Sequence, residues 1–307
     1  MMSLISDARQ INISDCSYLR KAFHGFNKDS WVYFSPFLFA YSLPPRRSVY
    51  ILKESGSTII FQYLRRQKMD RIDLLIPPLP LNNRSFKWIS RLTREVKLEE
   101  AQKELRILWV DDSDKKLLGK YFKDHIYFEV RDEEYIYSPS DVWQASGGKF
   151  RDFRKKIHRA SNMLPVFRKM TPEDVGDANS LLKDWRRKQG RRNGFLLDWG
   201  YTRSILSTFF KFKEEDLSAW CVEIEGKLKA FAMAGPISSD MACFFIAKSD
   251  PSFSGLSEYQ RWRVCGELSE YGFVNDAGDL GIDGLKRHKS KLRPVRYNMV
   301  HSATITM

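Results

Sequence analysis

The order of predicted strands and helices between residues 219 and 271 constrains the fold of this 307-residue chain more than any other stretch. Ala219 to Glu225 and Leu228 to Ala234 are rich in apolar and β-branched residues, which predicts two strands joined by a Gly-Lys turn. Met241 to Lys248 predicts a further strand, followed by a loop and then a helix over Leu256 to Tyr271. This order predicts a mixed sheet with helices packed on it.

The first half of the chain shows a looser version of the same order. Its predicted elements are a helix over Asp15 to Phe26, strands over Val49 to Leu52, Thr58 to Tyr63 and Arg71 to Ile76, a helix over Ser85 to Val96, a strand over Arg106 to Val110 and an extended segment over His125 to Tyr137. A helix-start signal at Ser138-Pro139-Ser140-Asp141 then marks the beginning of a second series of helices and strands. We predict two α/β (α+β) domains, 1–130 and 131–307, related by an internal duplication that leaves no repeat at the level of residues.

Composition argues against several classes of protein. No segment approaches the roughly 20 consecutive apolar residues that a membrane-spanning helix needs, and the N-terminus lacks the basic and apolar regions of a secretory signal. We therefore expect a cytoplasmic protein. The four cysteines, Cys16, Cys221, Cys243 and Cys265, lie far apart and predict small buried side chains rather than disulfides or a zinc site. The five histidines are equally scattered and lack the context of a catalytic triad, which predicts surface or structural side chains, and no metal site is expected.

The positive charge of the chain is concentrated in three segments of its second half. Lys149 to Lys169, Lys183 to Arg192 and Lys286 to Arg296 together hold 20 Lys/Arg and two acids, whereas the whole chain has a net charge of +13. The remainder therefore carries a net charge of −5. This concentration indicates a polyanionic partner, with RNA, an anionic lipid surface and a phosphorylated small molecule as the options. A solvated basic face without a partner is the alternative.

Two of these segments predict surfaces for phosphate groups. Gly147 to Ala160 places Phe150, Phe153 and Ile157 on one side of a helix and its cations on the other, although an ordinary amphipathic helix has the same pattern. Trp185 to Gly194 ends a predicted helix, and the helix dipole accounts for only one or two of its cations. The candidate phosphate-binding residues are Lys149, Arg151, Arg154, Lys155, Lys156, Arg159, Arg191, Arg192 and Arg293.

The loop from Pro251 to Gly255 lies where a strand ends and a helix begins. Such a turn presents unpaired backbone N–H groups to an anion, which makes Ser252 and Gly255 candidates for substrate binding. A helix cap at Ser252 or Ser254 is the alternative use of the serines.

The run from Tyr271 to Pro294 crowds four glycines and three aspartates ahead of a cationic tail. Its glycines allow positive φ and close backbone approach, so a tight loop can place Asn275, Asp276 and Asp279 around one point. Lys289 can face the same point and neutralise developing negative charge. A structural turn with exposed aspartates remains the alternative.

The same run resembles the C-terminal signature of a known family. Asn275, Gly278, Asp279-Leu280-Gly281-Ile282, Gly284-Leu285, Lys289 and Pro294 look like the signature of the phosphatidylglycerol lysyltransferase C-terminal (DUF2156) family. Tyr137-Ser138, Asp141, Gly148-Lys149 and Arg154-Lys155-Lys156 are similar to its mid-chain motif. The resemblance covers the second half of the chain, and the first half only through its order of elements and the aromatic run that begins at Trp31.

The resemblance implies two tandem domains of the N-acyltransferase (GNAT) type and transfer of an aminoacyl group from aminoacyl-tRNA to an amine or hydroxyl. The expected acceptor is a small molecule or a lipid. The lipid-modifying members carry a transmembrane region that this sequence does not show, which favours the small molecule. Because no nucleophile with an adjacent base is visible, we expect direct attack without an enzyme-bound intermediate.

The expected roles follow from that reaction. Asp279 and Asn275 would orient the α-amine of the donor, and Lys289 or a strand-edge N–H would stabilise the oxyanion. Asp276, Tyr259, Ser252 and Gly255 would bind substrate, and the basic residues would hold the tRNA. We expect no cofactor, and peripheral contact with an anionic membrane is a possible further interaction. The alternatives are an acyl-coenzyme A-dependent N-acyltransferase, whose pyrophosphate the loop from Ser252 to Gly255 would bind, and a non-catalytic protein that binds RNA or anionic membranes.

Overall fold

The computed structural model describes residues 3–43, 48–54, 56–66, 69–98, 104–190 and 199–306. Within these residues the strands join into one mixed sheet of twelve strands in the order β1-β2-β3-β4-β5-β12-β6-β11-β10-β9-β8-β7. The strands are β1 (Arg9–Gln10), β2 (Val49–Glu54), β3 (Ser57–Arg66), β4 (Met69–Leu74), β5 (Leu105–Asp111), β6 (Ile126–Tyr137), β7 (Val166–Lys169), β8 (Ser218–Ile224), β9 (Lys227–Pro236), β10 (Met241–Ser249), β11 (Phe273–Asn275) and β12 (Arg296–Ile305).

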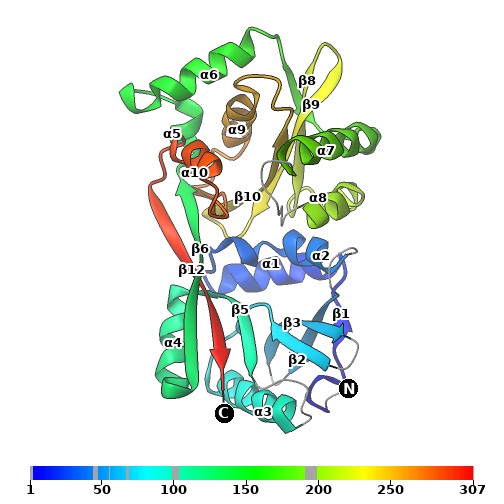
Figure 1. Ribbon diagram of the computed structural model, residues 1–307, viewed down its shortest axis with the longest axis vertical. Coiled ribbons are helices and arrows are strands. Elements are labelled where there is room, and N and C mark those ends of the chain that lie inside the picture. Colours follow the sequence, from blue (N-terminus) through cyan, green and yellow to red (C-terminus); the bar gives the residue numbers. More distant parts are fainter. Residues whose placement is uncertain are drawn as a thin grey trace.

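Helices pack along this sheet, which confirms the predicted mixed α/β class (Figure 1). The α-helices are α1 (Asp15–Gly25), α2 (Ser35–Ser42), α3 (Asn83–Leu98), α4 (Asp112–Phe122), α5 (Pro139–Gln144), α6 (Arg151–Ser161), α7 (Val175–Gly190), α8 (Trp199–Leu206), α9 (Leu256–Glu267) and α10 (Asp283–Ser290).

The N-terminal half builds its own core around α3 and α4. Helix α3 buries Phe86, Ile89 and Leu92 at the spacing of one helical face. Helix α4, which the sequence pattern did not predict, begins where the Asp111 carboxylate accepts a hydrogen bond from the Asp114 backbone N–H at 2.8 Å. Its buried Leu118 joins the same core, so both helices are fixed on this part of the sheet.

The C-terminal half has antiparallel strands β7 to β10, followed by a short parallel contact between β10 and β11. That contact pairs only three residues of each strand, Met241 to Cys243 with Phe273 to Asn275. A register shift between Phe244 and Ile246 breaks the pairing of β10 with β9. Helix α9 then packs beside β9 and β10 and carries side chains toward the end of β11.

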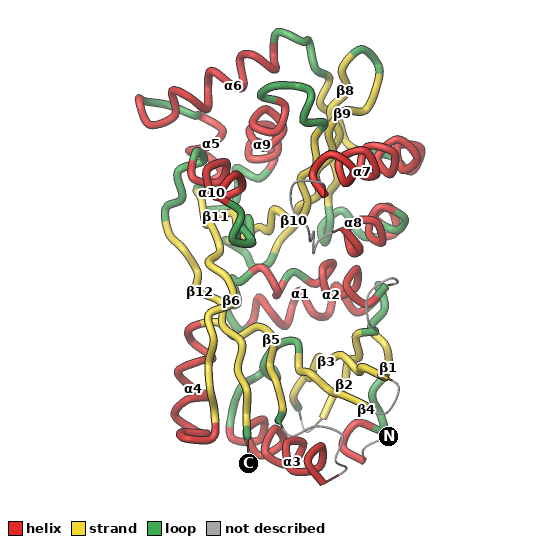
Figure 2. The backbone as a smooth tube through the Cα atoms, in the orientation of Figure 1, coloured by secondary structure: helices red, strands yellow, loops and turns green. Residues whose placement is uncertain are grey.

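Strands β6 and β12 connect the two halves. They pair antiparallel from Ile126↔Ile305 to Ile136↔Arg296, and Figures 1 and 2 show them running side by side along the long axis. Strand β12 also pairs with β5, whereas the end of β6 pairs with β11. Residue 130, near which we predicted the domain boundary, lies inside β6. The last strand of the chain is therefore part of the sheet of the first half.

An aromatic cluster fills the space between the halves, where α1 and α2 lie in Figure 2. The ring of Trp31 lies 4.2 Å from that of Phe37, and the ring of Phe245 lies 5.2 Å from that of Phe34. Tyr201 stacks on Phe245 at 5.5 Å. Because these residues come from η2 (Trp31–Tyr33), α2, α8 and β10, both halves share one apolar core.

Candidate active site

The glycine-rich loop between β11 and α10 has an unusual backbone. Ala277, Leu280 and Gly281 have φ angles of 53°, 56° and 68°, in the left-handed region. Gly278 does not need positive φ; instead, a Cβ there would collide with the carboxyl group of Asp132. The glycines of this run therefore serve two different purposes, positive φ at Gly281 and close approach of the backbone to β6 at Gly278.

Lys289 holds the loop from inside. Its buried Nζ donates to the carbonyl oxygens of Asp276, Ala277 at 3.1 Å and Gly278 at 2.7 Å. Burial lowers the pKa of this ammonium, since the charged form is kept away from water. An ammonium engaged with three carbonyl groups of one loop fixes the course of that loop. The geometry thus assigns Lys289 a positioning role rather than the oxyanion contact that we expected.

Asp276 is the centre of a buried ionic network. Arg261 Nη1 of α9 donates to its Oδ2 at 2.6 Å, the hydroxyl of Tyr137 donates to the same oxygen, and Lys289 Nζ lies 3.8 Å away. Burial alone would raise the pKa of Asp276, but the charges of Arg261 and Lys289 hold it below its usual value. The carboxylate is therefore ionised, and its Oδ2 is held by three protein groups, which makes it a structural anchor of the site.

Asn275 connects the loop to the first half of the chain. Its Nδ2 donates to Glu134 Oε2 at 2.7 Å and to the Asp29 carbonyl at 3.0 Å, and its Oδ1 accepts from the backbone N–H of Ala277 at 2.8 Å. The side chain is completely buried. All of these hydrogen bonds are to protein groups, and the bond from the Ala277 N–H fixes the orientation of the backbone at Ala277.

Glu134 is the buried partner of Asn275. Its Oε1 accepts from Ser30 Oγ at 2.7 Å and from the Trp31 backbone N–H at 3.0 Å. Burial raises the pKa of Glu134 to about 7, although the donors around it oppose that rise. A carboxyl group that titrates near neutrality thus lies between the aromatic cluster and the glycine-rich loop.

Asp279 is the acid of the loop that remains half-exposed. Its Oδ2 accepts a hydrogen bond from the Tyr135 hydroxyl at 2.6 Å, and its Oδ1 accepts from the Gly281 backbone N–H at 2.9 Å. Asp132 is close enough to interact with it electrostatically, and burial together with this neighbour raises the pKa of Asp132. Two neighbouring carboxyl groups beside a tyrosine hydroxyl form an acidic site that suits an ammonium group.

Strand β6 supplies functional side chains that our sequence analysis missed. Asp132 and Glu134 precede Tyr135 and Tyr137 on this strand, so that one stretch brings both acids and hydroxyl groups to the loop and its surroundings. These residues are visible in the sequence RDEEYIY, but the segment was predicted only to be extended, and Tyr137 was named only as part of the mid-chain motif. Arg261 was also missed, because nothing in the pattern of α9 shows that this residue is buried against Asp276.

The predicted phosphate-binding residues divide into two groups. Arg154 Nη1 donates to the carbonyls of Ala145 at 2.5 Å and Gly147 at 2.7 Å, and Arg293 Nε donates to that of Lys149 at 2.8 Å. These arginines therefore brace the start of α6. Lys149 itself forms an exposed ion pair with Asp141 at 3.4 Å.

The exposed face of α6 keeps cations without such engagements. Arg151 and Lys155 are exposed and have no ion-pair partner among the described residues, and Lys156 is half-buried. Arg159 Nη1 donates to Ser254 Oγ at 3.0 Å. Arg191 and Arg192 lie outside the described residues.

The loop before α9 is covered by α6. Gly255 is the N-cap of α9 with a φ of 89°, and a Cβ there would collide with the backbone carbonyl of Lys156. Ser252 Oγ accepts from Lys188 Nζ at 3.0 Å and makes no cap to the helix. Tyr259 lies on the buried side of α9 within an apolar core. The Lys156 backbone thus lies against Gly255, one of the residues that we predicted to bind pyrophosphate.

One further group of side chains has spacing that could suit a metal ion. Among the described residues, Asp174, Cys221 and Glu223 have ligand atoms within 4.8 Å of one another. Arg168 already donates to Asp174 at 2.7 and 2.8 Å and to the carboxylate of Glu223. Its cationic guanidinium satisfies both acids, so the group is an ion-pair network.

Three comparisons place this geometry among known proteins. A solved protein of unknown function from Bacteroides thetaiotaomicron has the same fold over 100% of both chains, with a TM-score of 0.80 and 17% identity. The C-terminal DUF2156 domain of a protein described as a lysylphosphatidylglycerol synthetase, from Agrobacterium fabrum, matches 95% of this chain and 92% of its own, with a TM-score of 0.62 and 13% identity. A tandem GNAT protein from the clavulanic acid pathway matches 97% of both chains, with a TM-score of 0.51 and 9% identity.

These likenesses confirm the predicted GNAT-like fold, and the family is shown by the sequence itself. A search of curated proteins finds no match. Among the described residues, no helix combines the length and the apolar character needed to cross a membrane. The family described as "Phosphatidylglycerol lysyltransferase, C-terminal" matches residues 96–300, which include the glycine-rich loop, β6 and α6. The chain therefore belongs to the phosphatidylglycerol lysyltransferase C-terminal (DUF2156) family, as its motifs had indicated, and has the fold of an acyltransferase.

Proposed function

We propose that the protein is an aminoacyltransferase that moves an aminoacyl group from aminoacyl-tRNA to an amine or hydroxyl of a small molecule or lipid. The observation that carries this proposal is the acidic site at Asp279, beside Asp132 and the Tyr135 hydroxyl. An aminoacyl ester carries a free α-ammonium group next to the reactive carbonyl. A carboxylate pair that binds this ammonium would hold the carbonyl at a fixed place on the edge of the loop.

The reaction needs no covalent intermediate. The acceptor nitrogen or oxygen attacks the ester carbonyl, a new amide or ester bond forms, and the bond to the ribose oxygen of the tRNA breaks. The proton of the acceptor passes to that ribose oxygen. The four cysteines are buried, and burial raises the pKa of Cys221 and Cys265 to about 12, so these thiols offer no thiolate nucleophile near pH 7. All four are free, which fits the reducing environment of the cytoplasm.

The exposed side of α6 is the surface that we assign to the tRNA backbone. Arg151 and Lys155 project from consecutive turns and lack acidic partners among the described residues. Such cations contact phosphates without reading bases. Arg154, Arg159 and Arg293, in contrast, donate hydrogen bonds to protein oxygens, and these bonds stabilise the position of α6.

Coenzyme A is less well supported as the donor, because the backbone of Lys156 closes the loop before α9 at Gly255. The decisive experiment supplies the protein with a mixture of radiolabelled aminoacyl-tRNAs and an extract of small molecules and lipids. We expect label to leave tRNA faster than by spontaneous ester hydrolysis and to appear in the acceptor fraction. Loss of label at the spontaneous rate for every amino acid would refute aminoacyl transfer.

A pair of variants tests the role of the acidic site. Asp279→Asn should abolish transfer and leave tRNA binding unchanged, because the substitution removes only the charge that holds the ammonium. Asp283→Asn is the matched control, since Asp283 is an exposed acid at the start of α10 in the same segment. Equal losses in both variants, or loss of tRNA binding in the first, would assign Asp279 to structure instead.

A further inference from the structure

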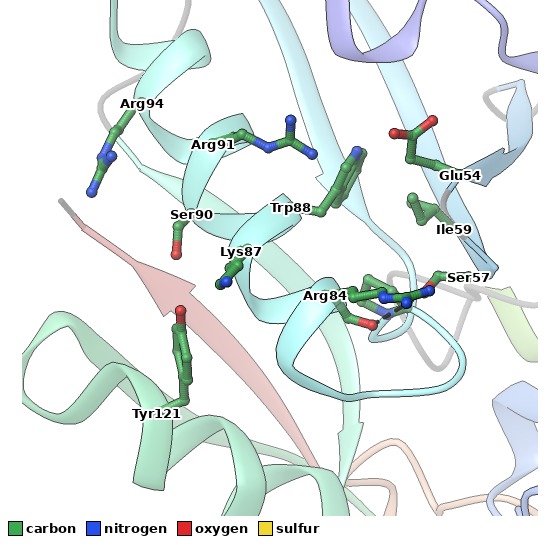
Figure 3. A pocket seen from close by; sticks show the side chains of 12 residues that line it. Glu54, Ser57, Ile59, Arg84, Lys87, Trp88, Ser90, Arg91, Arg94 and Tyr121 are labelled. Carbon is green, nitrogen blue, oxygen red and sulfur yellow. Dashed lines mark hydrogen bonds between the residues drawn. The ribbon is translucent and has the colours of Figure 1, made fainter.

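A cavity of about 720 Å³ lies on the outer face of α3, in the N-terminal half. Its walls come from α3, from the hairpin of β2 and β3 and from Tyr121 of α4 (Figure 3). In Figure 1, α3 lies at the opposite end of the long axis from α6 and α9. The cavity is therefore separate from the candidate active site, and its size is that of pockets that bind small ligands.

Four cations of α3 line this cavity. Arg84, Lys87, Arg91 and Arg94 follow one another at intervals of three, four and three residues, which places them in one stripe along the helix. All four are exposed, and none has an ion-pair partner among the described residues. Because a residue advances a helix by about 1.5 Å, the stripe extends over roughly 15 Å. Among the residues that the structure describes, Glu54 is the one acid in the cavity wall.

A buried donor without a partner adds to this positive surface. Trp88 lines the same cavity and is 3% exposed, and its buried indole Nε1 has no hydrogen-bond partner in the part of the chain that the structure describes. A buried N–H of this kind normally has an acceptor. Figure 3 shows the guanidinium of Arg91 extending toward the indole of Trp88. An anionic oxygen between them would serve both groups.

We propose that this cavity binds a compact oligophosphate, a small molecule that carries at least two linked phosphate groups. The wall offers several cations to one ligand, the buried N–H of Trp88 lies next to them, and phosphate oxygens accept from groups of both kinds. Two or three linked phosphates carry more charge and more acceptor oxygens than one phosphate, so they can contact more of these cations at once. The cavity distinguishes this site from the exposed face of α6, and its concave shape favours a small ligand over an RNA backbone.

Titration calorimetry with inorganic triphosphate at low ionic strength tests the proposal. We expect saturable binding with one site per chain and at least a tenfold loss of affinity in the double variant Lys87→Gln/Arg91→Gln. The matched control is Lys116→Gln/Lys120→Gln, which removes the same charge from the exposed side of the neighbouring α4 and should change affinity less than twofold. Trp88→Phe should also weaken binding, because it keeps the ring and removes only the N–H donor.

Three outcomes would overturn the proposal. The first is the absence of binding at millimolar triphosphate, and the second is an equal loss of affinity in the two double variants. The third is binding of a single-stranded RNA, lost in Lys87→Gln/Arg91→Gln, by a protein that does not bind triphosphate. Circular dichroism and the melting temperature of each variant show that it is folded. Since no transfer reaction is measured, the result is independent of the proposed aminoacyltransferase activity.

Discussion

The buried carboxyl group of Glu134 leads to a prediction about pH and stability. Glu134 connects Ser30 and Trp31 of the first half to Asn275, the last residue of β11 before the glycine-rich loop. Its pKa of about 7 in the folded protein lies above its usual value of 4.5. The folded state therefore binds this proton more tightly than the unfolded chain, and the unfolding free energy falls as the pH rises through this interval.

The size of the effect follows from the two pKa values. Between pH 5 and pH 8, ionisation of Glu134 should lower the unfolding free energy by roughly 2 to 3 kcal/mol. Glu134→Gln removes this dependence because the amide does not titrate. The substitution also turns an N–H toward Asn275 Nδ2, which already donates, and this costs about 1 to 3 kcal/mol at every pH. The variant should thus be less stable than the parent at pH 5 and similar to it at pH 8.

Urea denaturation followed by tryptophan fluorescence at several pH values measures the difference. Glu133→Gln is the control, since Glu133 is the exposed neighbour on the same strand and its replacement should leave the pH profile of the parent unchanged. A difference between Glu134→Gln and the parent that stays constant within about 0.5 kcal/mol from pH 5 to pH 8 would refute the argument. Glu134 would then ionise outside this interval.

Three further substitutions test the site and the shared core. Arg261→Met leaves the Asp276 carboxylate buried without its guanidinium partner and should cost about 3 to 5 kcal/mol in urea denaturation. Gly278→Ala pushes a methyl group against Asp132 and should lower the unfolding free energy by about 1 to 3 kcal/mol, as measured by melting. In the labelled-tRNA assay the same variant should reduce transfer more severely than the Asp283→Asn control does. Phe245→Ala opens the aromatic cluster and should cost about 3 to 5 kcal/mol; a loss below 1 kcal/mol would show that the halves do not depend on this core.

Local sequence patterns correctly predicted helices and strands that bury one face. The same patterns did not predict the elements that depend on contacts between distant parts of the chain. The helix α1, the hairpin of β2 and β3 and the strands β8 to β10 lie where the pattern placed them. No helix or strand was assigned after Tyr271, yet these residues form β11, α10 and β12. Strand β12 alternates exposed and buried residues only in part, and its pairing with the distant strands β5 and β6 is not visible in a local pattern.

The candidate site was predicted only in part, because some of its contacts also join residues that are far apart in the sequence. The turn chemistry of the glycine-rich run led us to expect Asn275, Asp276 and Asp279 around one point; in the structure Asn275 ends β11, and the two acids lie in the loop that follows. The pattern could not show that Asp276 is paired with Arg261 or that Asn275 is bonded to Glu134, which lies far away in the sequence. Which acid remains available to a ligand therefore depends on partners that only the folded chain brings together.

The pairing of β12 with β5 has a consequence for synthesis on the ribosome. Strand β5 needs a neighbour from residues 296–305, about 190 residues later in the chain, so its outer hydrogen-bonding edge stays open while the second half is being made. Strand pairings between residues so far apart in the sequence form slowly, and an unpaired strand edge can form hydrogen bonds with other chains. A nascent chain that stalls before residue 296 would thus expose this edge, and we expect chaperone capture to be strongest at that stage.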